Sequence, residues 1–507
     1  MDKSKNNIDW TTMLIPFAIV IALMGIFMIA PDQSKSTIDS LRFFFGDTIG
    51  IYYTLLAAGS VICALYVAMK DKYGLTRLGN TDVPAYSDFK WGTMIFTSTM
   101  AADILFYSLI EWALYGGEQH VQDLGGTQMW AETFTLFHWG PLAWGFYVIL
   151  AVCFAFMIHI RKRTRQRFSE ACRPLLGNKV DGICGKIIDV LAIFAIVCAT
   201  ATTFSLATPL LTKALGSVLG FEVSTLVTIV TLLLICSVYT ITVLFGIKGI
   251  SKLAGICSYL FFAILLYFLF LGGETGYILE SGIQSFGNML ENFIMLSTYM
   301  DPLRENSFAQ NWTVYYWAYW LVWCVATPFF IALISKGRTL RNVVYGTFGW
   351  GLAGTYMSFI ILGGYGVSRQ LKYGEDIIGF IGNGGEMYDA ILMIFDTLPL
   401  PSLALLLLVI TMIAFYSTTL DGITYVTSAY SYKRIAPDEE PSRPIRAFWS
   451  IMLIFLPIAL LFAQNSLYGL QGVTIIAAFP VGLMLIMIVW SFFKDFNRWY
   501  KNGRQTL

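Results

Sequence analysis

The hydrophobic positions of this chain run in long, continuous stretches that short polar segments separate. Twelve stretches are long enough, at roughly 20 apolar residues each, to cross the hydrocarbon core of a bilayer as helices. They cover 12–30, 51–69, 92–113, 135–159, 187–212, 222–247, 254–272, 312–334, 345–367, 402–428, 446–463 and 471–493. The pattern therefore predicts an all-α polytopic membrane protein with twelve transmembrane helices.

The composition agrees with a chain that is surrounded by a lipid bilayer. Of its 507 residues, 57% are hydrophobic and 13% are charged, whereas soluble domains carry about 25% charged residues. The 33 Lys and Arg balance the 32 Asp and Glu, so no net charge points to a nucleic-acid partner. The eight cysteines show no disulfide or zinc-binding spacing, and the three histidines argue against a His-built metal site.

The distribution of basic residues predicts the orientation in the membrane. With the N-terminus inside, 27 of the 33 Lys and Arg fall in cytoplasmic segments, which is the usual bias of membrane proteins. We therefore expect a multi-pass protein of the cell (inner, cytoplasmic) membrane with both termini in the cytoplasm. The densest basic run, 161–167, is interpreted as an orientation signal, and a lipid-headgroup site is the alternative.

Aromatic residues follow helical stripes on two of the predicted spans. The stripes lie at similar depth and contain Trp312, Tyr316, Tyr319, Trp320 and Trp323 on one span and Trp139, Trp144 and Tyr147 on the other. Aromatic belts at the membrane interface and ordinary packing are one explanation. The other is a cage for a cation, because ring faces attract quaternary ammonium groups.

Two predicted spans contain helix-breaking sequences. The third span has a Thr- and Ser-rich segment before Asp103, and the eighth contains Ala326-Thr327-Pro328, where proline removes a backbone hydrogen bond. Broken helices expose backbone groups at the midplane of transporters. Each begins a group of five spans with opposite directions, which suits an inverted repeat.

Three motifs resemble those of the betaine/carnitine/choline transporter family, and the resemblance fits the whole length. They are Phe137-His138-Trp139-Gly140-Pro141, the aromatic segment 312–320, and Ile334-Ser335-Lys336-Gly337-Arg338-Thr339-Leu340-Arg341. The family implies two N-terminal helices followed by a five-plus-five inverted repeat, usually as a homotrimer. It also implies alternating-access transport of small trimethylammonium compounds.

The expected organisation has five parts. They are the cytoplasmic N-terminus with two peripheral helices (1–91), the first repeat (92–272), an amphipathic surface linker (273–311), the second repeat (312–493) and a short cytoplasmic tail (494–507).

The resemblance also implies a substrate cage. Its aromatic walls match Trp139, Trp144, Tyr147, Tyr319, Trp320 and Trp323. Tyr319 stands where many members have tryptophan. Leu114 stands where carnitine-exchanging members have a tyrosine, so that wall is missing or is replaced by Tyr115.

A candidate sodium site follows from the same resemblance. Its matching positions are Phe415, Thr418 and Thr419, together with backbone carbonyls near Thr97 and Met100. The alternative is that these threonines bond only carbonyls of their own helix. Sodium-independent exchangers carry an arginine at the position of Cys257, which argues against ion-independent exchange here.

Asp103 departs from the glycine-rich sequence of the family. Ionisable residues inside a membrane are costly and usually functional. Choline-selective members resemble this chain in carrying aspartate there, and a carboxylate would balance a cation that lacks one. Proton coupling through Asp103 and a structural role are the alternatives. Glu111 and Asp189 are expected to be structural pairs or caps.

These observations favour a secondary transporter of the choline, glycine betaine and carnitine class, without a resident cofactor and with sodium or proton coupling. A carnitine/butyrobetaine-type exchanger is the alternative within transport. A multi-span membrane enzyme lacks support because no HExxH, GxSxG or GxxxxGK[ST] motif occurs. A channel fits poorly with broken, inverted helices.

Overall fold

The computed structural model describes residues 7–97, 102–245, 247–435, 439–462 and 467–504, and most of this part is helical. The first half contains α1 (Trp10–Ile29), α2 (Pro31–Arg42), α3 (Ile51–Met69), α4 (Asp71–Gly74), α5 (Asp88–Thr97), α6 (Ala102–Gly116), α7 (Gln119–Leu124), α8 (Thr127–His138), α9 (Pro141–Ala155), α10 (Phe168–Ala171), α11 (Arg173–Leu176) and α12 (Ile183–Leu219). The second half contains α13 (Thr225–Phe245), α14 (Ile247–Leu266), α15 (Thr275–Glu291), α16 (Phe293–Thr298), α17 (Val314–Trp323), α18 (Thr327–Ile334), α19 (Leu340–Ser358), α20 (Gly364–Tyr373), α21 (Ile377–Gly382), α22 (Met387–Asp396), α23 (Pro401–Tyr430), α24 (Arg443–Phe462) and α25 (Leu467–Arg504).

Each of the twelve predicted stretches coincides with one helix or with consecutive helices. Within the described residues, six helices are long and apolar enough to cross a membrane, and up to nine spans result when each bent pair is counted as one. The prediction of an all-helical, multi-span membrane protein is confirmed. The number of twelve spans stays a prediction.

Both interruptions that the sequence indicates are bends in the structure. α5 and α6 meet at 68°, and the segment between them lies outside the described residues. α17 and α18 meet at 53°, and Pro328 occupies the start of α18, where a proline lacks no helical hydrogen bond. Each bend lets one membrane-spanning stretch end and restart inside the protein.

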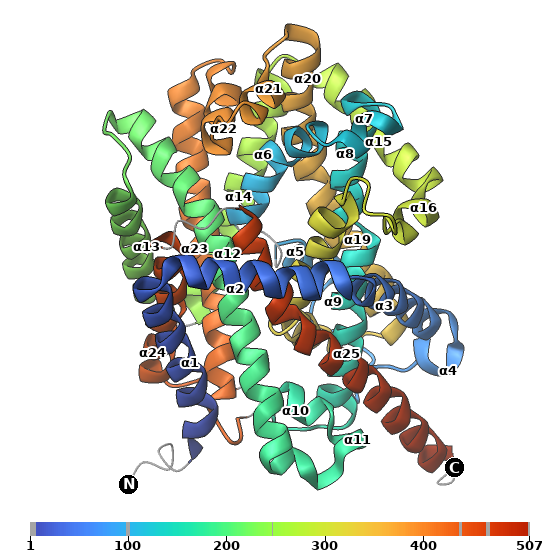
Figure 1. Cartoon of the computed structure of the whole chain (residues 1–507). Coiled ribbons are helices and arrows are strands. Elements are labelled where there is room, and N and C mark those ends of the chain that lie inside the picture. The colour runs from blue at the N-terminus through green and yellow to red at the C-terminus, as the bar shows by residue number, and fades with distance from the viewer. Residues whose placement is uncertain (1–6, 98–101, 246, 436–438, 463–466, 505–507) are drawn as a thin grey trace.

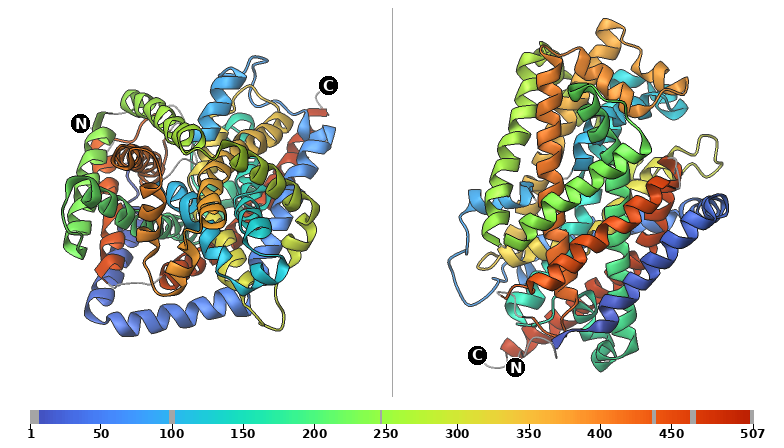
Figure 2. Two further views of the ribbon diagram at one scale, coloured as in Figure 1. Left: turned by 90° about the horizontal axis from the view of Figure 1, so that it is seen from above. Right: turned by 90° about the vertical axis from the view of Figure 1, so that its left-hand side faces the viewer.

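The long helices pack in a recurring set of pairs. α12 and α25 lie side by side and cross the molecule (Figures 1 and 2). The other pairs that matter for the arrangement are α23 with α14, α12 with α24, α23 with α13, α6 with α23, α17 with α12, α18 with α9, α5 with α19, and α13 with α24.

The predicted amphipathic linker forms α15 and α16. α15 turns by 111° from the preceding apolar helix and packs on α8 and α20. Its buried residues include Ile278, Gly282, Ser285 and Met289, spaced at three or four positions, as expected for a helix with one buried face.

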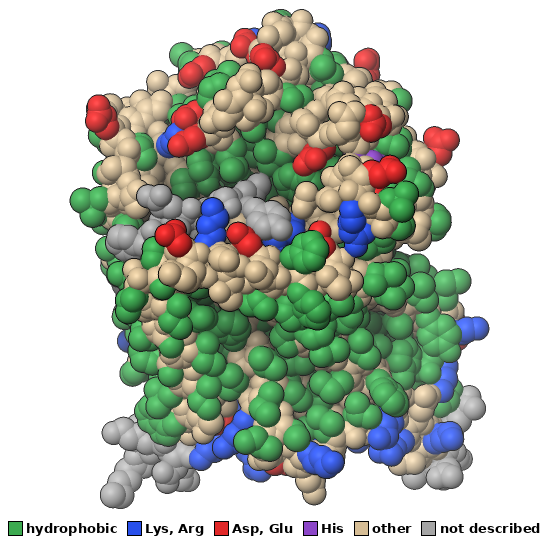
Figure 3. Space-filling view, viewed as in Figure 1, with side chains coloured by type: hydrophobic (Ala, Val, Ile, Leu, Met, Phe, Trp, Pro, Cys, Tyr) green, Lys and Arg blue, Asp and Glu red, His purple; other side chains and the backbone are tan. Residues whose placement is uncertain are grey.

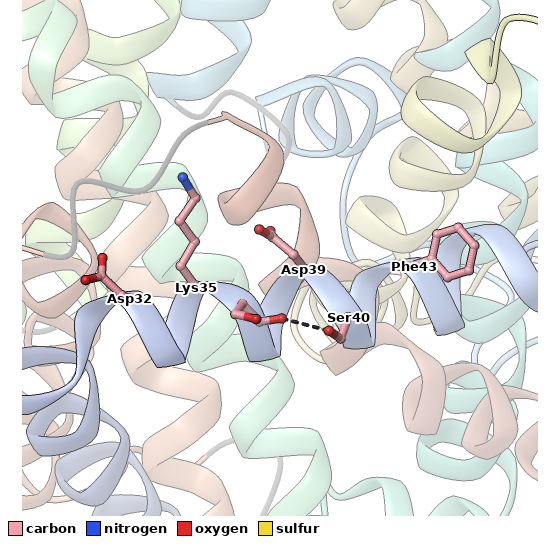
Figure 4. Close-up of a pocket in the computed structure, with 6 residues that line it drawn as sticks. Asp32, Lys35, Asp39, Ser40 and Phe43 are labelled. Carbon is pink, nitrogen blue, oxygen red and sulfur yellow. Dashed lines mark hydrogen bonds between the residues drawn. The ribbon is translucent and has the colours of Figure 1, made fainter.

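α2 lies between the first two predicted spans, in a segment for which the apolar pattern predicts no span. Ser34, Ile38 and Arg42 recur every four residues and form its buried face, which packs on α25. Figure 1 shows α2 lying across the front of the molecule. Asp32 and Lys35 project from it at a shallow pocket of about 620 Å³ (Figure 4). This polar pocket lies away from the predicted aromatic cage.

Charged side chains are distributed unevenly between the two ends of the molecule. On the face in Figure 3, Lys and Arg gather at the lower end, and Asp and Glu gather mainly at the upper end. Both chain ends lie at the lower end (Figure 1). The aromatic cluster described next is buried among the helices.

Candidate functional site

Trp320 of α17 lies at the centre of the predicted aromatic set. Its ring centroid is 5.6 Å from that of Trp139, 5.5 Å from that of Trp144 and 4.9 Å from that of Tyr147. The interplanar angles are between 55° and 70°. The rings are therefore tilted like adjoining walls and are not stacked face to face. Residues about 180 positions apart in the sequence thus form one aromatic cluster.

The turn from α8 into α9 lies at this aromatic cluster. Trp139 caps the end of α8, and Gly140-Pro141 turn the chain into α9. The added Cβ of a residue larger than Gly140 would lie 2.5 Å from the carbonyl oxygen of Leu136, so the turn requires glycine. The motif around Trp139 therefore fixes where its ring enters the bundle.

Small residual accessibility distinguishes one face of α17 from the others. Three of its ten residues retain any accessible surface: Tyr319 at 3%, Trp320 at 3% and Trp323 at 9%. They lie at i, i+1 and i+4, which is one face of a helix. All three belong to the predicted cage, and the remaining aromatic residues of α17 are fully buried. Trp323 extends this face by one helical turn beyond Trp320.

Glu111 of α6 fixes the orientation of Trp139. One carboxylate oxygen, Oε2, accepts a hydrogen bond of 2.9 Å from the indole N–H of Trp139, and Glu111 is fully buried. The expectation of a structural partner is confirmed, but the partner is a cage residue.

Asp103 lies in the first turn of α6 and is connected to the cluster through α12. Its Oδ2 is 3.3 Å from the hydroxyl of Thr203, which is 3.0 Å from the hydroxyl of Tyr319. Asp103 is 96% buried, and no ion pair between described residues involves it. Its position at a helix N-terminus favours the charged carboxylate. Asp103 thus places a buried carboxyl group close to the aromatic cluster.

Tyr107 is a site residue that the sequence analysis missed. Asp103, Tyr107 and Glu111 are spaced by four residues and share one face of α6. The Tyr107 ring lies 5.7 Å from Trp139 and 6.2 Å from Tyr319. The spacing from Asp103 was a signal that could have identified it.

Tyr115 does not fill the wall that Leu114 leaves open. Its ring contacts Trp312 at 5.0 Å, and its hydroxyl is hydrogen-bonded to His138 at 2.7 Å. It therefore belongs to a neighbouring group of aromatic residues. Tyr107 is the α6 ring that faces the cluster.

The candidate sodium-site residues lie on α5 and α23. The hydroxyl of Thr418 donates to the carbonyls of Ala414 and Phe415, at 3.3 and 3.1 Å. Thr97 donates to the carbonyl of Thr93 at 2.9 Å. These bonds use the hydroxyl protons and leave oxygen lone pairs for another partner. Met100 lies outside the described residues.

The ring of Phe261 on α14 joins the two helices of this region. It lies 5.8 Å from Phe96, next to Thr97, and 6.1 Å from Phe415. The sulfur of Cys257, also on α14, is 3.7 Å from the Thr418 hydroxyl, and Thr419 is half-buried. No group of three or more His, Cys, Asp or Glu suited to a metal occurs in the described part, so any ion here would bind hydroxyl and carbonyl oxygens.

Arg167 connects several elements at the end that carries the termini. Its guanidinium pairs with Asp9 at 3.0 Å and Asp189 at 3.2 Å. It also donates to the carbonyls of Tyr430 and Tyr432, at 2.7 and 2.5 Å. The expectation that Asp189 is a structural pair is confirmed. Burial raises the pKa of Asp9, but Arg167 lowers it further, so the pKa is below its usual value.

Other arginines of the basic run also form ion pairs. Arg163 pairs with Asp495 of α25 at 2.8 Å. Arg173 and Arg165 donate hydrogen bonds to Asp181, and they hold the pKa of that carboxyl well below its usual range. The pair between Arg163 and Asp495 holds the connection between α9 and α12 against α25, and the pairs with Asp181 lie within this connection.

Comparison with known proteins covers nearly the whole chain. The model of the betaine/carnitine/choline family of transporters matches residues 11–501. A probable glycine betaine transporter of Desulfitobacterium hafniense is 27% identical over 97% of this chain and 98% of its own. The glycine betaine transporter OpuD of Bacillus subtilis is 26% identical over 98% and 96%. A carnitine transporter of Acinetobacter baumannii is 24% identical over 84% and 77%.

Proposed function

This chain belongs to the betaine/carnitine/choline transporter family, and from this premise we propose that it carries choline-like trimethylammonium compounds across the membrane by alternating access. It is a multi-pass membrane transporter of the betaine/carnitine/choline class and not an enzyme. The proposal concerns the preferred substrate, the residues that bind it and the ion that drives transport.

The aromatic cluster around Trp320 is the observation that carries the proposal. Three tilted rings contact Trp320, and Tyr319 and Trp323 share with Trp320 the face of α17 that retains accessible surface. A desolvated cation at a ring face gains on the order of 2 kcal/mol per contact. Three or four such contacts offset the dehydration of a weakly hydrated trimethylammonium group.

Asp103 supports choline as the preferred member of the class. The carboxylate lies two hydrogen bonds from Tyr319, through Thr203. It balances the charge of choline, whereas it repels the carboxylate of glycine betaine or carnitine. The names of the relatives favour glycine betaine and carnitine. We choose choline because Asp103 places a buried carboxyl group near the cage.

Sodium is the proposed coupling ion. The hydroxyls of Thr418 and Thr419 with carbonyls near Thr97 and Met100 supply the hard oxygen ligands that Na⁺ prefers. Cys257 contacts Thr418 where an exchanger would carry a positive charge, which supports ion-coupled transport over exchange. Proton coupling through Asp103 is the alternative that the experiment below distinguishes.

The packing of the helices supports the five-plus-five inverted repeat over 92–272 and 312–493. Exchange of the two repeats converts α12–α25 into α23–α14, α12–α24 into α23–α13, α5–α19 into α17–α9, and α6–α19 into α18–α9, and all eight pairs occur. Both broken spans begin a repeat. The remaining parts of the proposal are the peripheral helices in 1–91, the linker 273–311, cytoplasmic termini including the tail 494–507, and a homotrimer.

Uptake into proteoliposomes tests this function. Labelled choline, glycine betaine and carnitine are offered with a sodium gradient, a proton gradient, or neither, and internal unlabelled substrate reveals exchange. We expect sodium-driven uptake with choline preferred. Uptake that responds to the proton gradient alone would assign coupling to Asp103, and transport of none of the three compounds would refute the proposal.

A further inference from the structure

Thr203 differs from the neighbouring threonines of α12 in what its hydroxyl contacts. Thr200 donates to the carbonyl of Ile196, four residues back, as threonines in helices usually do. Thr202 bonds the carbonyl of Cys198 in the same way and also contacts the hydroxyl of Thr474 on α25 at 2.8 Å. In the described part of the chain, the Thr203 hydroxyl instead contacts the Asp103 carboxylate and the Tyr319 hydroxyl. It therefore serves contacts between helices.

The three groups form a hydrogen-bonded chain with one possible direction when Asp103 is charged. A carboxylate only accepts hydrogen bonds, and each hydroxyl has one proton to donate. Thr203 donates its proton to Asp103 and must then accept from Tyr319. The proton of Tyr319 is used as well, so its oxygen offers only lone pairs to a bound ligand.

We propose that Thr203 is a positioning residue that sets this polarity, and that the site thereby selects trimethylammonium compounds with a hydroxyl group over those with a carboxylate. This inference rests on the proposed function and refines its substrate class. A substrate hydroxyl donates to the Tyr319 oxygen. A substrate carboxylate has no proton to donate. The lone pairs of the Tyr319 oxygen and the negative charge of Asp103 therefore both repel it.

Because the hydroxyls are buried, the direction of their hydrogen bonds affects the affinity for a ligand. Thr203 is 2% accessible and Tyr319 is 3% accessible, so water does not readily satisfy a mismatched group there. A buried acceptor left without a donor costs roughly 1–3 kcal/mol, which corresponds to about a 5- to 150-fold change in affinity. Selectivity of that size can come from one hydroxyl.

Three variants test the inference by displacement of labelled choline from the purified protein. Thr203→Val keeps the shape but removes the hydroxyl, so Tyr319 is free to donate to a carboxylate. The ratio of choline affinity to glycine betaine affinity should fall about tenfold or more. Thr203→Ser should restore the ratio. Thr200→Val, whose hydroxyl serves its own helix, should leave it unchanged.

A second set of variants removes the hydroxyl of Tyr319, at the other end of the hydrogen-bonded chain. Tyr319→Phe should lower the same ratio, and the Thr203→Val, Tyr319→Phe double variant should lower it no further, because both changes break one chain. Equal losses for both ligands in Thr203→Val, or additive effects in the double variant, would overturn the role of Thr203. If Thr203→Val does not fold, Tyr319→Phe with Thr203→Ser decides the question. A wild type that binds neither ligand would refute the proposed function itself.

Discussion

Replacing Trp320 by alanine removes the ring that the other cage residues contact. One desolvated cation–π contact contributes on the order of 2 kcal/mol, so we expect the Kd for choline to rise about 30-fold. Trp320 also makes three ring contacts, at 4.9 to 5.6 Å, each worth about 0.5–1.5 kcal/mol to the fold. Because the alanine variant therefore loses stability, Trp320→Phe is measured beside it and should retain part of the affinity.

Trp317 provides a matched control on the same helix. It is fully buried and contacts Phe137 and His138, at 5.5 and 5.9 Å. The indole N–H groups of Trp317 and Trp320 have no hydrogen-bond partner among the described residues. The change to phenylalanine therefore breaks no hydrogen bond at either position, and the pair isolates the effect of the ring on the ligand.

Equilibrium binding of labelled choline to detergent-purified protein is the assay, with thermal melting measured on the same samples. We expect Trp317→Phe to bind with wild-type affinity even where its melting temperature falls. Wild-type affinity in Trp320→Ala would refute the cage. So would the same loss of affinity in Trp317→Phe and Trp320→Phe, since a general loss of packing would then explain both.

Three further predictions concern charge, coupling and stability. Asp103→Asn should weaken choline roughly 10- to 100-fold and glycine betaine much less, because only choline loses a counter-charge; displacement of labelled choline by each ligand measures this, and equal losses would make Asp103 structural. Replacing both Thr418 and Thr419 by alanine should abolish sodium-stimulated uptake in proteoliposomes without lowering the melting temperature appreciably, and unchanged sodium dependence would exclude these hydroxyls as ligands. Arg167→Met should lower the melting temperature because breaking a buried ion pair costs about 3–5 kcal/mol, whereas Lys162→Met, in the exposed part of the same basic run, should have little effect; similar melting temperatures would contradict this reading of the Arg167 contacts.

Much of the fold follows from the sequence because membrane helices need long apolar runs. The broken spans were recognisable from Pro328 and from the polar segment before Asp103. α2 was missed because it contains few apolar residues, and its buried face of Ser34, Ile38 and Arg42 is mostly polar. Its four-residue spacing was present in the sequence, but the packing on α25 that makes it a helix was not.

The aromatic walls were predictable for a similar reason, since Trp320 and its neighbours repeat at helical spacing. The contacts between helices were not. Thr203 meets Asp103 across 100 positions of sequence, and Glu111 meets Trp139 from another helix. Such pairs depend on the relative rotation of packed helices, which local patterns do not determine.

The most direct test of the cage compares choline with its uncharged isostere, in which a carbon atom replaces the quaternary nitrogen. The two compounds have nearly the same shape and the same hydroxyl, so they differ in the charge that the rings and Asp103 recognise. Displacement of labelled choline from the wild-type protein measures both affinities. We predict that the isostere binds at least 100-fold more weakly, on the order of two lost cation–π contacts. Comparable affinities would contradict recognition of the trimethylammonium charge at this site.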